Sequence, residues 1–76
     1  QEPLLVRADW DEDAGLGADS DDVPRLTTEA STVESLVAKL KQMIPELLEL
    51  NGVPGQGQVA FELPIRRFDT AECAAA

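Results

Sequence analysis

The segment between Thr32 and Asn51 constrains the fold of this chain more than any other. Its apolar residues recur at spacings of three and four and form one stripe along a helix: Val33, Leu36, Val37, Leu40, Met43, Ile44, Leu47 and Leu48. One such stripe can cover one face of one sheet, and 76 residues leave room for little else. The helix therefore predicts a small α+β domain.

Local signals mark both ends of this helix. Ser31 or Thr32 is expected to cap its N-terminus, and Ser31 with Glu34 has the spacing of a capping box. The Asn-Gly pair at 51–52, with Pro54 beyond it, marks its C-terminus. A flexible Gly- and Pro-rich linker is expected to follow.

Pro45 falls inside the helical pattern. It has no N–H to donate to the carbonyl of Lys41, so we expect the helix to kink or restart there.

Four segments carry strand patterns. Residues 4–10 and residues 59–65 alternate apolar and polar side chains. Residues 25–30 contain β-branched threonines, which are typical of a short strand. Residues 16–20 form the weakest candidate, because Gly17 interrupts them.

The connections between these segments predict the topology. Residues 11–15 (DEDAG) indicate a hairpin turn with Gly15 at positive φ, and Pro24 turns the chain again. Tight connections make the first three strands antiparallel, and a helical crossover makes the final strand parallel to the first. Pro64 favours an edge or a bulge at the end of the final strand. The expected order is β-β-β-α-β.

The core is expected where the helix crosses the sheet. We expect one domain over residues 1–76, with an ordered part at 4–68 and a flexible tail at 69–76. The predicted core residues are Trp10, Val37, Leu40, Ile44, Phe61 and Leu63.

The negative charge is concentrated in one region. The chain has 15 acidic and 6 basic residues, a net charge of −9, and seven of the acids lie between residues 9 and 22 with no Lys or Arg among them. Such a field repels nucleic acid and attracts a basic protein or a cation. The alternative is that this acidic segment is a solvated loop that binds no partner. The candidate partner-binding residues are Asp9, Asp11, Asp13, Asp19, Asp21 and Asp22.

The composition argues against several other classes of protein. Cys73 is the single cysteine and there is no histidine, so the chain has no disulfide and lacks the commonest zinc ligand and general base. No apolar run reaches the roughly 18 residues of a membrane span. We expect a cytoplasmic protein without cofactor or metal, and without direct contact with nucleic acid or membrane.

Two metal-dependent functions, a nuclease and a calcium site, fit the sequence less well than a protein-binding role. A ribonuclease H-type nuclease needs several converging carboxylates, but Glu34 is explained by capping and Glu62 alternates away from the apolar set. An EF-hand start matches Asp9, Asp11 and Asp13. That pattern then fails, since Ala14 occupies the glycine position and Ser20 the glutamate position. We therefore expect no catalytic activity.

An ordered set of short motifs runs through the chain: DEDAG at 11–15, Asp-Val-Pro at 22–24, Leu26, Thr-Glu-Ala at 28–30 and Thr32 before the helix. In this order the set resembles the HicB-like antitoxin family. The segment KLKQMIPELLELNG, residues 39–52, is similar to a single-domain branch of that family. Together the resemblance covers about residues 4–65.

This resemblance implies both a fold and a function. The family has a partial ribonuclease H-type sheet in the same β-β-β-α-β order. Its members inhibit small basic RNA-cleaving toxins of the HicA type by covering them. The acidic charge of the chain supports the same kind of partner by an independent route.

The chain departs from the family in three places. Arg25 stands where the family usually has glycine. Residues 15–20 are one residue short and lack the usual aromatic, so a frayed or bulged second strand is expected. Eight residues follow Phe68, too few for the DNA-binding segment of the family, so autorepression is not expected.

These observations predict an antitoxin-like module that occludes a small basic toxin without turnover. The alternative is an orphan acidic adaptor of the same fold that binds another protein. A core this small with an exposed sheet edge also predicts pairing with another copy, as a homodimer or higher oligomer.

Overall fold

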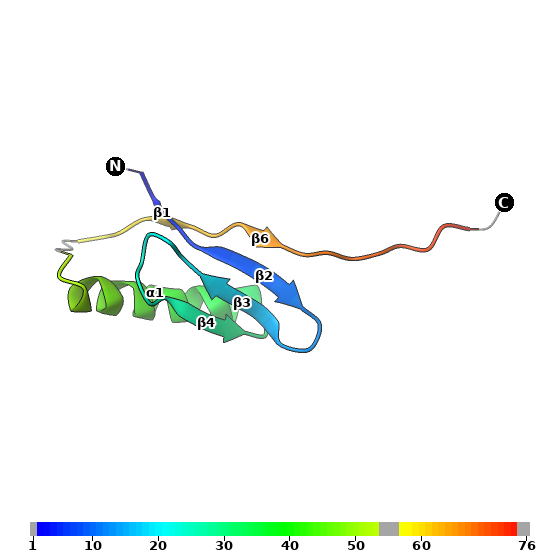
Figure 1. The fold of residues 1–76 in the computed structure, drawn as a ribbon, viewed down its shortest axis with the longest axis horizontal. Helices are drawn as coiled ribbons and strands as arrows, with labels where there is room; N and C mark the ends of the chain where they lie inside the picture. Colours follow the sequence, from blue (N-terminus) through cyan, green and yellow to red (C-terminus); the bar gives the residue numbers. More distant parts are fainter. Residues whose placement is uncertain (1, 54–56, 75–76) are drawn as a thin grey trace.

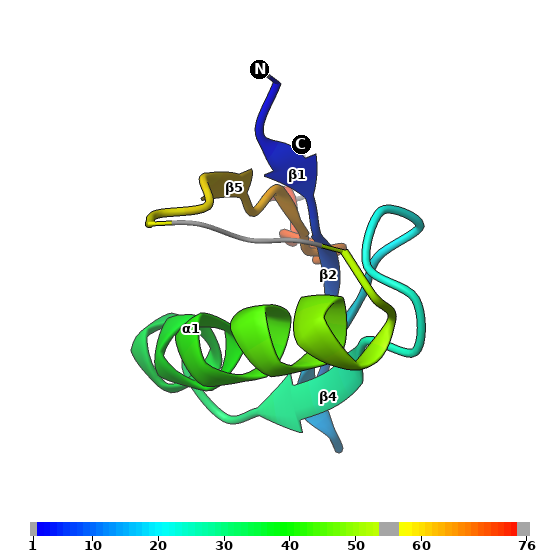
Figure 2. The same cartoon turned by 90° about the vertical axis from the view of Figure 1, so that its left-hand side faces the viewer.

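The computed structural model describes residues 2–53 and 57–74, and one helix lies on one side of a mixed sheet (Figures 1 and 2). The elements in chain order are β1 (Leu4–Leu5), β2 (Arg7–Asp11), β3 (Gly15–Asp19), β4 (Thr27–Ala30), α1 (Val33–Leu50), β5 (Phe61–Glu62) and β6 (Ile65–Arg66). The predicted first and final strands are each divided in two. The predicted α+β fold in β-β-β-α-β order is confirmed.

The main sheet has the strand order β4-β3-β2-β6, and β1 pairs with β5. The pairs β2–β3 and β3–β4 are antiparallel, whereas β2–β6 and β1–β5 are parallel. The N–H groups of residues 4, 6 and 8 donate to the carbonyls of residues 60, 62 and 64 at 2.9, 3.0 and 3.1 Å. The final segment of the chain therefore runs parallel to the first strand along its whole length, as predicted.

Pro64 explains why this parallel ladder is divided. In a regular parallel ladder the N–H of residue 64 would return a bond to the carbonyl of Val6. Proline has no N–H, so the ladder is interrupted between β5 and β6 on one side and between β1 and β2 on the other. As expected for a strand that contains proline, β6 lies at an edge of the sheet.

The prediction of a frayed or bulged second strand is wrong. β3 is a regular central strand, paired residue by residue with β2 on one side and with β4 on the other. Its first residue, Gly15, has φ +81°, and a Cβ there would lie 2.6 Å from the carbonyl oxygen of Ala30. Glycine at position 15 thus permits both the hairpin turn and the close approach of β4.

The ends of α1 are capped by side chains and by a Schellman motif. Thr32 is the N-cap, with its Oγ1 accepting from the N–H of Ser35 at 3.1 Å, so Ser31 does not form the capping box. At the other end Gly52 has φ +72°, and the N–H of Val53 donates to the carbonyl of Leu48 at 2.9 Å. The predicted stop at residues 51–52 is confirmed, and Pro54 lies outside the described residues.

Of the two outcomes predicted at Pro45, a kink or a restart, the restart does not occur. It runs without a break from Val33 to Leu50 with Pro45 inside it. Pro45 is exposed, while the flanking Ile44 is almost fully buried. Packing of the apolar face against the sheet therefore holds the helix together where one backbone bond is missing. Among the described residues no helix is both long and apolar enough to cross a membrane.

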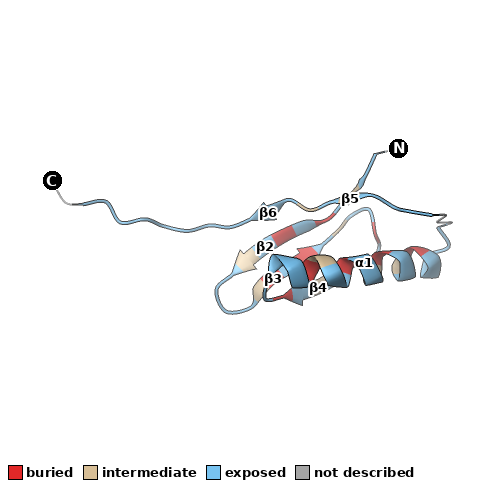
Figure 3. Cartoon of the chain, turned by 180° about the vertical axis from the view of Figure 1, so that it is seen from behind, coloured by how far each residue is buried: buried red, intermediate tan, exposed pale blue. Residues whose placement is uncertain are grey.

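The predicted core is confirmed at two of its three helix positions. Leu40 and Ile44 are buried as predicted, and Trp10, Phe61 and Leu63 pack partly buried against the core. Val37 is only half-buried, because the innermost row of α1 follows a strict spacing of four. Figure 3 shows the buried positions of α1 as red bands that recur along the helix. The buried residues are Val6, Ala8, Leu16, Ala18, Val23, Leu26, Ala30, Leu36, Leu40, Ile44 and Leu48.

Arg25 is the non-glycine residue with positive φ in the described part of the chain, at +70°. An L-residue in this left-handed conformation is strained by about 1 kcal/mol or more. Arg25→Gly is therefore expected to raise the free energy of unfolding by about 0.5–1 kcal/mol, after the extra flexibility of glycine in the unfolded chain is subtracted. Urea unfolding checks this, with Arg25→Ala as a control that keeps the strain. Equal stability of the two variants would contradict it.

The chain leaves the body of the domain after β6. Residues 67–74, which we call the arm, run outward in an extended conformation at the end opposite the N-terminus (Figure 1). The arm accounts for the elongated shape, 60 × 25 × 19 Å. Within the predicted tail, residues 75–76 lie outside the described residues.

Candidate functional site

Opposite the helix, the sheet presents a solvated face that we call the open face. In β2, β3 and β4 the buried residues alternate with exposed ones, which point away from α1. Figure 3 shows this alternation as changes of colour along the strands. The exposed set contains Arg7, Asp9, Asp11, Gly17, Asp19, Thr27 and Glu29.

One row across the open face has a carboxylate on each side of a glycine. Asp9 of β2 pairs with Gly17 of β3, and Gly17 pairs with Glu29 of β4. The backbones of the two acids are about 10 Å apart, two strand spacings. Gly17 does not have a positive φ, and a Cβ there would meet nothing within 4 Å. Unfilled space therefore lies over Gly17 between the two carboxylates, and we call this row the trough; Arg66 of β6 continues the row on the other side of Asp9.

Asp11 and Asp13 lie at the hairpin end of the same region. The Oδ1 atom of Asp11 accepts from the N–H groups of Asp13 and Ala14, at 2.8 and 3.3 Å, and thereby supports the turn. Asp13 itself is exposed. These two acids extend the negative region beyond Asp9 toward the tip of the hairpin.

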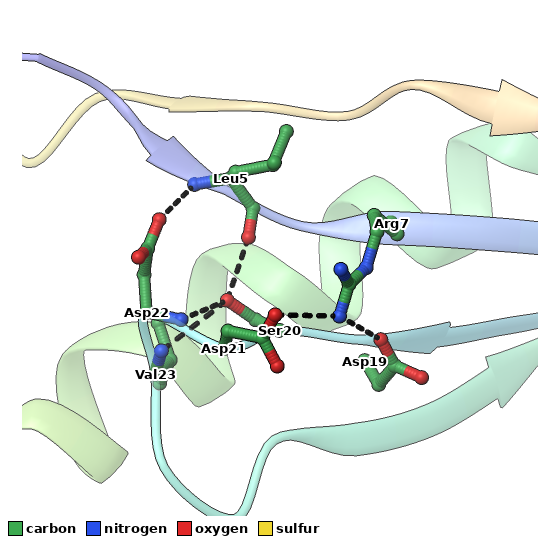
Figure 4. A network of polar contacts seen from close by, with 7 residues as sticks. All are labelled: Leu5, Arg7, Asp19, Ser20, Asp21, Asp22 and Val23. Carbon is green, nitrogen blue, oxygen red and sulfur yellow. Dashed lines mark hydrogen bonds and ion pairs between the residues drawn. The ribbon is translucent and has the colours of Figure 1, made fainter.

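The remaining predicted acids lie at the end of β3 and on the loop after it, and two of them pair with a cation (Figure 4). One guanidinium nitrogen of Arg7 lies 3.3 Å from Asp19 and 3.1 Å from Asp21. The charge of Asp21, followed by the hydrogen bond from Arg7 to Asp19, raises the pKa of Arg7 above its ordinary value. Arg7 is charged at every working pH in any case. It partly neutralises this end of the predicted acidic site.

Asp22 has a structural role. Its Oδ2 atom accepts from the backbone N–H of Leu5 at 2.8 Å, and Ser20 Oγ donates to the carbonyl of Leu5 at 2.6 Å. Ser20 Oγ also accepts from the N–H groups of Asp22 and Val23. The loop after β3 is thus tied to β1, and Asp22 is engaged in the fold (Figure 4).

The six predicted aspartates therefore separate into two groups. Asp9, Asp11 and Asp13 belong to the open face and its hairpin tip, next to the trough. Asp19, Asp21 and Asp22 lie at the other end, held by Arg7 and Leu5. Sequence reasoning missed Gly17 and Glu29 as members of the site. The strand period of two could have placed Glu29 there, but the position of Gly17 between two acids depends on strand register.

The carboxylates considered for a nuclease do not converge. Asp9 points to the open face, whereas Glu34 lies in the first turn of α1 on the opposite side of the sheet. In the part of the chain that the structure describes, no group of three or more Asp, Glu, Cys or His side chains is arranged to hold a metal ion.

Comparison with known proteins places the chain in a family. The family described as "Domain of unknown function (DUF1902)" matches residues 3–71. A solved structure, the hypothetical protein TTHA1013 from the extremely thermophilic bacterium Thermus thermophilus, is 45% identical, with a TM-score of 0.68. The alignment covers 95% of this chain and all of that one. No curated protein matches. None of these matches carries the name of the HicB-like family, so that resemblance stays a prediction. On these matches, the chain belongs to the DUF1902 family.

Proposed function

We propose that this protein is a non-catalytic binding module of the antitoxin type. Its open face would cover a small basic RNA-cleaving toxin of the HicA type and exclude RNA from it. The resemblance of residues 4–65 to HicB-like antitoxins supports the class of partner, and the net charge of −9 supports a basic one.

The glycine at position 17 carries this proposal. In the middle of a central strand, glycine costs about 0.5–1 kcal/mol relative to alanine. The fold does not require that cost, because Gly17 has no positive φ and a side chain would have free space. Its absence leaves room for a partner side chain between Asp9 and Glu29. An arginine or lysine lying across β3 could interact with both carboxylates there.

The mechanism would be occlusion in two steps. The acids of the open face and hairpin tip attract the basic partner over a range set by the ionic strength. Contact over the trough then fixes its orientation and blocks access to its RNA-binding surface. Neither step requires bond making or breaking by this chain.

Gly17→Val tests the proposal because it separates stability from binding. Valine favours a central strand, so the free energy of unfolding should rise by about 1 kcal/mol. The same side chain fills the floor of the trough, so affinity for the toxin should fall at least ten-fold. Chemical unfolding and titration calorimetry measure the two effects.

The control is Thr27→Val, a β-branched substitution on the open face outside the trough. It should leave affinity within about two-fold. If Gly17→Val binds as tightly as the wild type, the trough is not the binding site.

The partner itself can be tested genetically. A short basic protein encoded next to this gene is expected to arrest growth when expressed alone, and co-expression of this chain should restore growth. Gly17→Val should fail to restore it although it is at least as stable. If no neighbouring gene product is toxic, the alternative interpretation as an acidic adaptor for another protein is favoured.

A further inference from the structure

The arm extends away from the body of its own chain (Figure 1). Every residue from Pro64 to Ala74 is exposed, and the Phe68 side chain is 82% exposed (Figure 3). A compact domain of this length has a radius of gyration of about 11 Å, whereas this chain has 15.5 Å. At the base of the arm the Arg67 guanidinium lies 4.8 Å from the centre of the Trp10 ring and 3.4 Å from the Asp69 carboxylate.

The two edges of the main sheet differ in how freely they could pair with a further strand. At the β4 edge the Lys39 ammonium donates to the backbone carbonyl of Glu29 at 2.5 Å. A charged side chain that occupies a backbone acceptor protects an edge against further strands. At the other edge lies β6, which continues directly into the arm. β6 and the arm together therefore offer the sheet's longer unprotected edge.

The charge sequence of this edge matches itself when reversed. Arg67 immediately precedes Phe68 and Asp69 immediately follows it, and within one chain these two side chains form an ion pair at 3.4 Å. Two copies aligned in parallel would place like charges opposite each other. Two copies aligned antiparallel about Phe68 place Arg67 of each copy opposite Asp69 of the other, so the attraction seen within one chain extends across the strand pair.

We infer that a second copy of this chain pairs along β6 and the arm, antiparallel and related by a two-fold axis at Phe68. This interaction does not depend on the toxin-binding function proposed above. It joins the two main sheets into one, with β6 of each copy paired to the arm of the other in the middle.

The pleat of the strands specifies the register. Arg66 lies opposite Asp9 on the open face, so by alternation Phe68 faces the same side. A two-fold axis perpendicular to the sheet places the open faces of both copies on the same side. Residues that pair across the axis must then point to the same face, so both have even numbers or both have odd numbers. Phe68 then lies opposite its symmetry mate, and Arg67 lies opposite Asp69 of the second copy. The two phenyl rings form a cross-strand aromatic pair.

Sedimentation provides the first test. We expect the wild type to be a dimer at micromolar concentration, and Phe68→Asp to weaken dimerisation at least ten-fold. Since Phe68 is mostly exposed, the circular dichroism spectrum of the variant should be unchanged. A wild type that stays monomeric at about 100 μM, well above the range of specific homodimers, or a Phe68→Asp variant that dimerises normally, would overturn the inference.

Charge exchange tests the antiparallel pairing. Arg67→Glu and Asp69→Arg should each weaken the homodimer, because each places like charges opposite each other twice. An equimolar mixture of the two variants should form a heterodimer at least ten-fold tighter than either homodimer. Failure of the mixture to associate would overturn the pairing of residues 67 and 69.

Disulfide trapping tests the register. Phe68→Cys in a Cys73→Ala background should form an intermolecular disulfide rapidly in a glutathione buffer, because the two sulfurs would face each other at the axis. The wild-type Cys73 is the matched control. In this register the two copies of Cys73 are about 33 Å apart and should not cross-link. Cross-linking through Cys73 but not through position 68 would show a different interface.

Discussion

Leu40→Ala is expected to lower the free energy of unfolding by about 2–5 kcal/mol. Leu40 is completely buried in the middle of the α1 row that packs against the sheet, with Leu36 before it and Ile44 after it. A domain of this size holds only a few kcal/mol of net stability. The variant should therefore be largely unfolded at room temperature.

Circular dichroism during urea unfolding measures this effect. The matched control is Val37→Ala on the same helix, which removes two carbons from a half-buried site and should cost about 1 kcal/mol. A loss below about 1 kcal/mol for Leu40→Ala would show that the helix packs in a different register.

The second large effect concerns association with the proposed toxin. Neutralising the trough with Asp9→Asn and Glu29→Gln should slow association at least ten-fold at low ionic strength. The two carboxylates flank the space over Gly17, and charges at an interface act chiefly on the rate of encounter. High salt shortens the screening length. Once this length is shorter than the site, the wild type and the double variant should associate at the same rate.

Stopped-flow association rates across a salt series measure the difference between the wild type and the double variant. The control is Arg7→Gln with Asp19→Asn, which removes an exposed ion pair and leaves the net charge unchanged. Its rate should stay close to that of the wild type. If both double variants associate as fast as the wild type at low salt, the open face is only a solvated surface.

Much of the fold could be predicted because its signals are local. The strict alternation in residues 4–10 and the apolar stripe from Val33 to Leu48 each depend on one element and its period. The parallel final strand followed from the helical crossover alone. The sequence left Ser31 and Thr32 as two candidates for the N-cap. Which hydroxyl accepts from a free N–H depends on the residue at which the chain enters the helix, and in the structure this residue is Thr32.

The missed features are those decided by tertiary contacts. β3 appeared weak because Gly17 lowers strand propensity, but two neighbouring strands satisfy its backbone on both sides. The helix passes Pro45 because burial of Ile44 and Leu48 outweighs one lost bond.

The candidate site was predicted in charge but only partly in geometry. The cluster of aspartates is visible in the sequence, whereas the role of each one depends on what lies opposite. Arg7 is 12 positions from Asp19 in the chain and faces it through strand pairing. The trough likewise exists only because register aligns Asp9, Gly17 and Glu29 in one row.

The interruption at Pro64 has a consequence for how the molecule assembles. β2, β3, β4 and α1 are consecutive in the chain and can form through short-range contacts, which are fast. The segment from β5 to β6 must return over a long loop to a ladder that lacks one bond, so it is expected to dock last and to open first. The same segment carries the edge assigned to the second copy. Mass action then links its docking to dimerisation, so the domain would become more resistant to local opening as its own concentration rises.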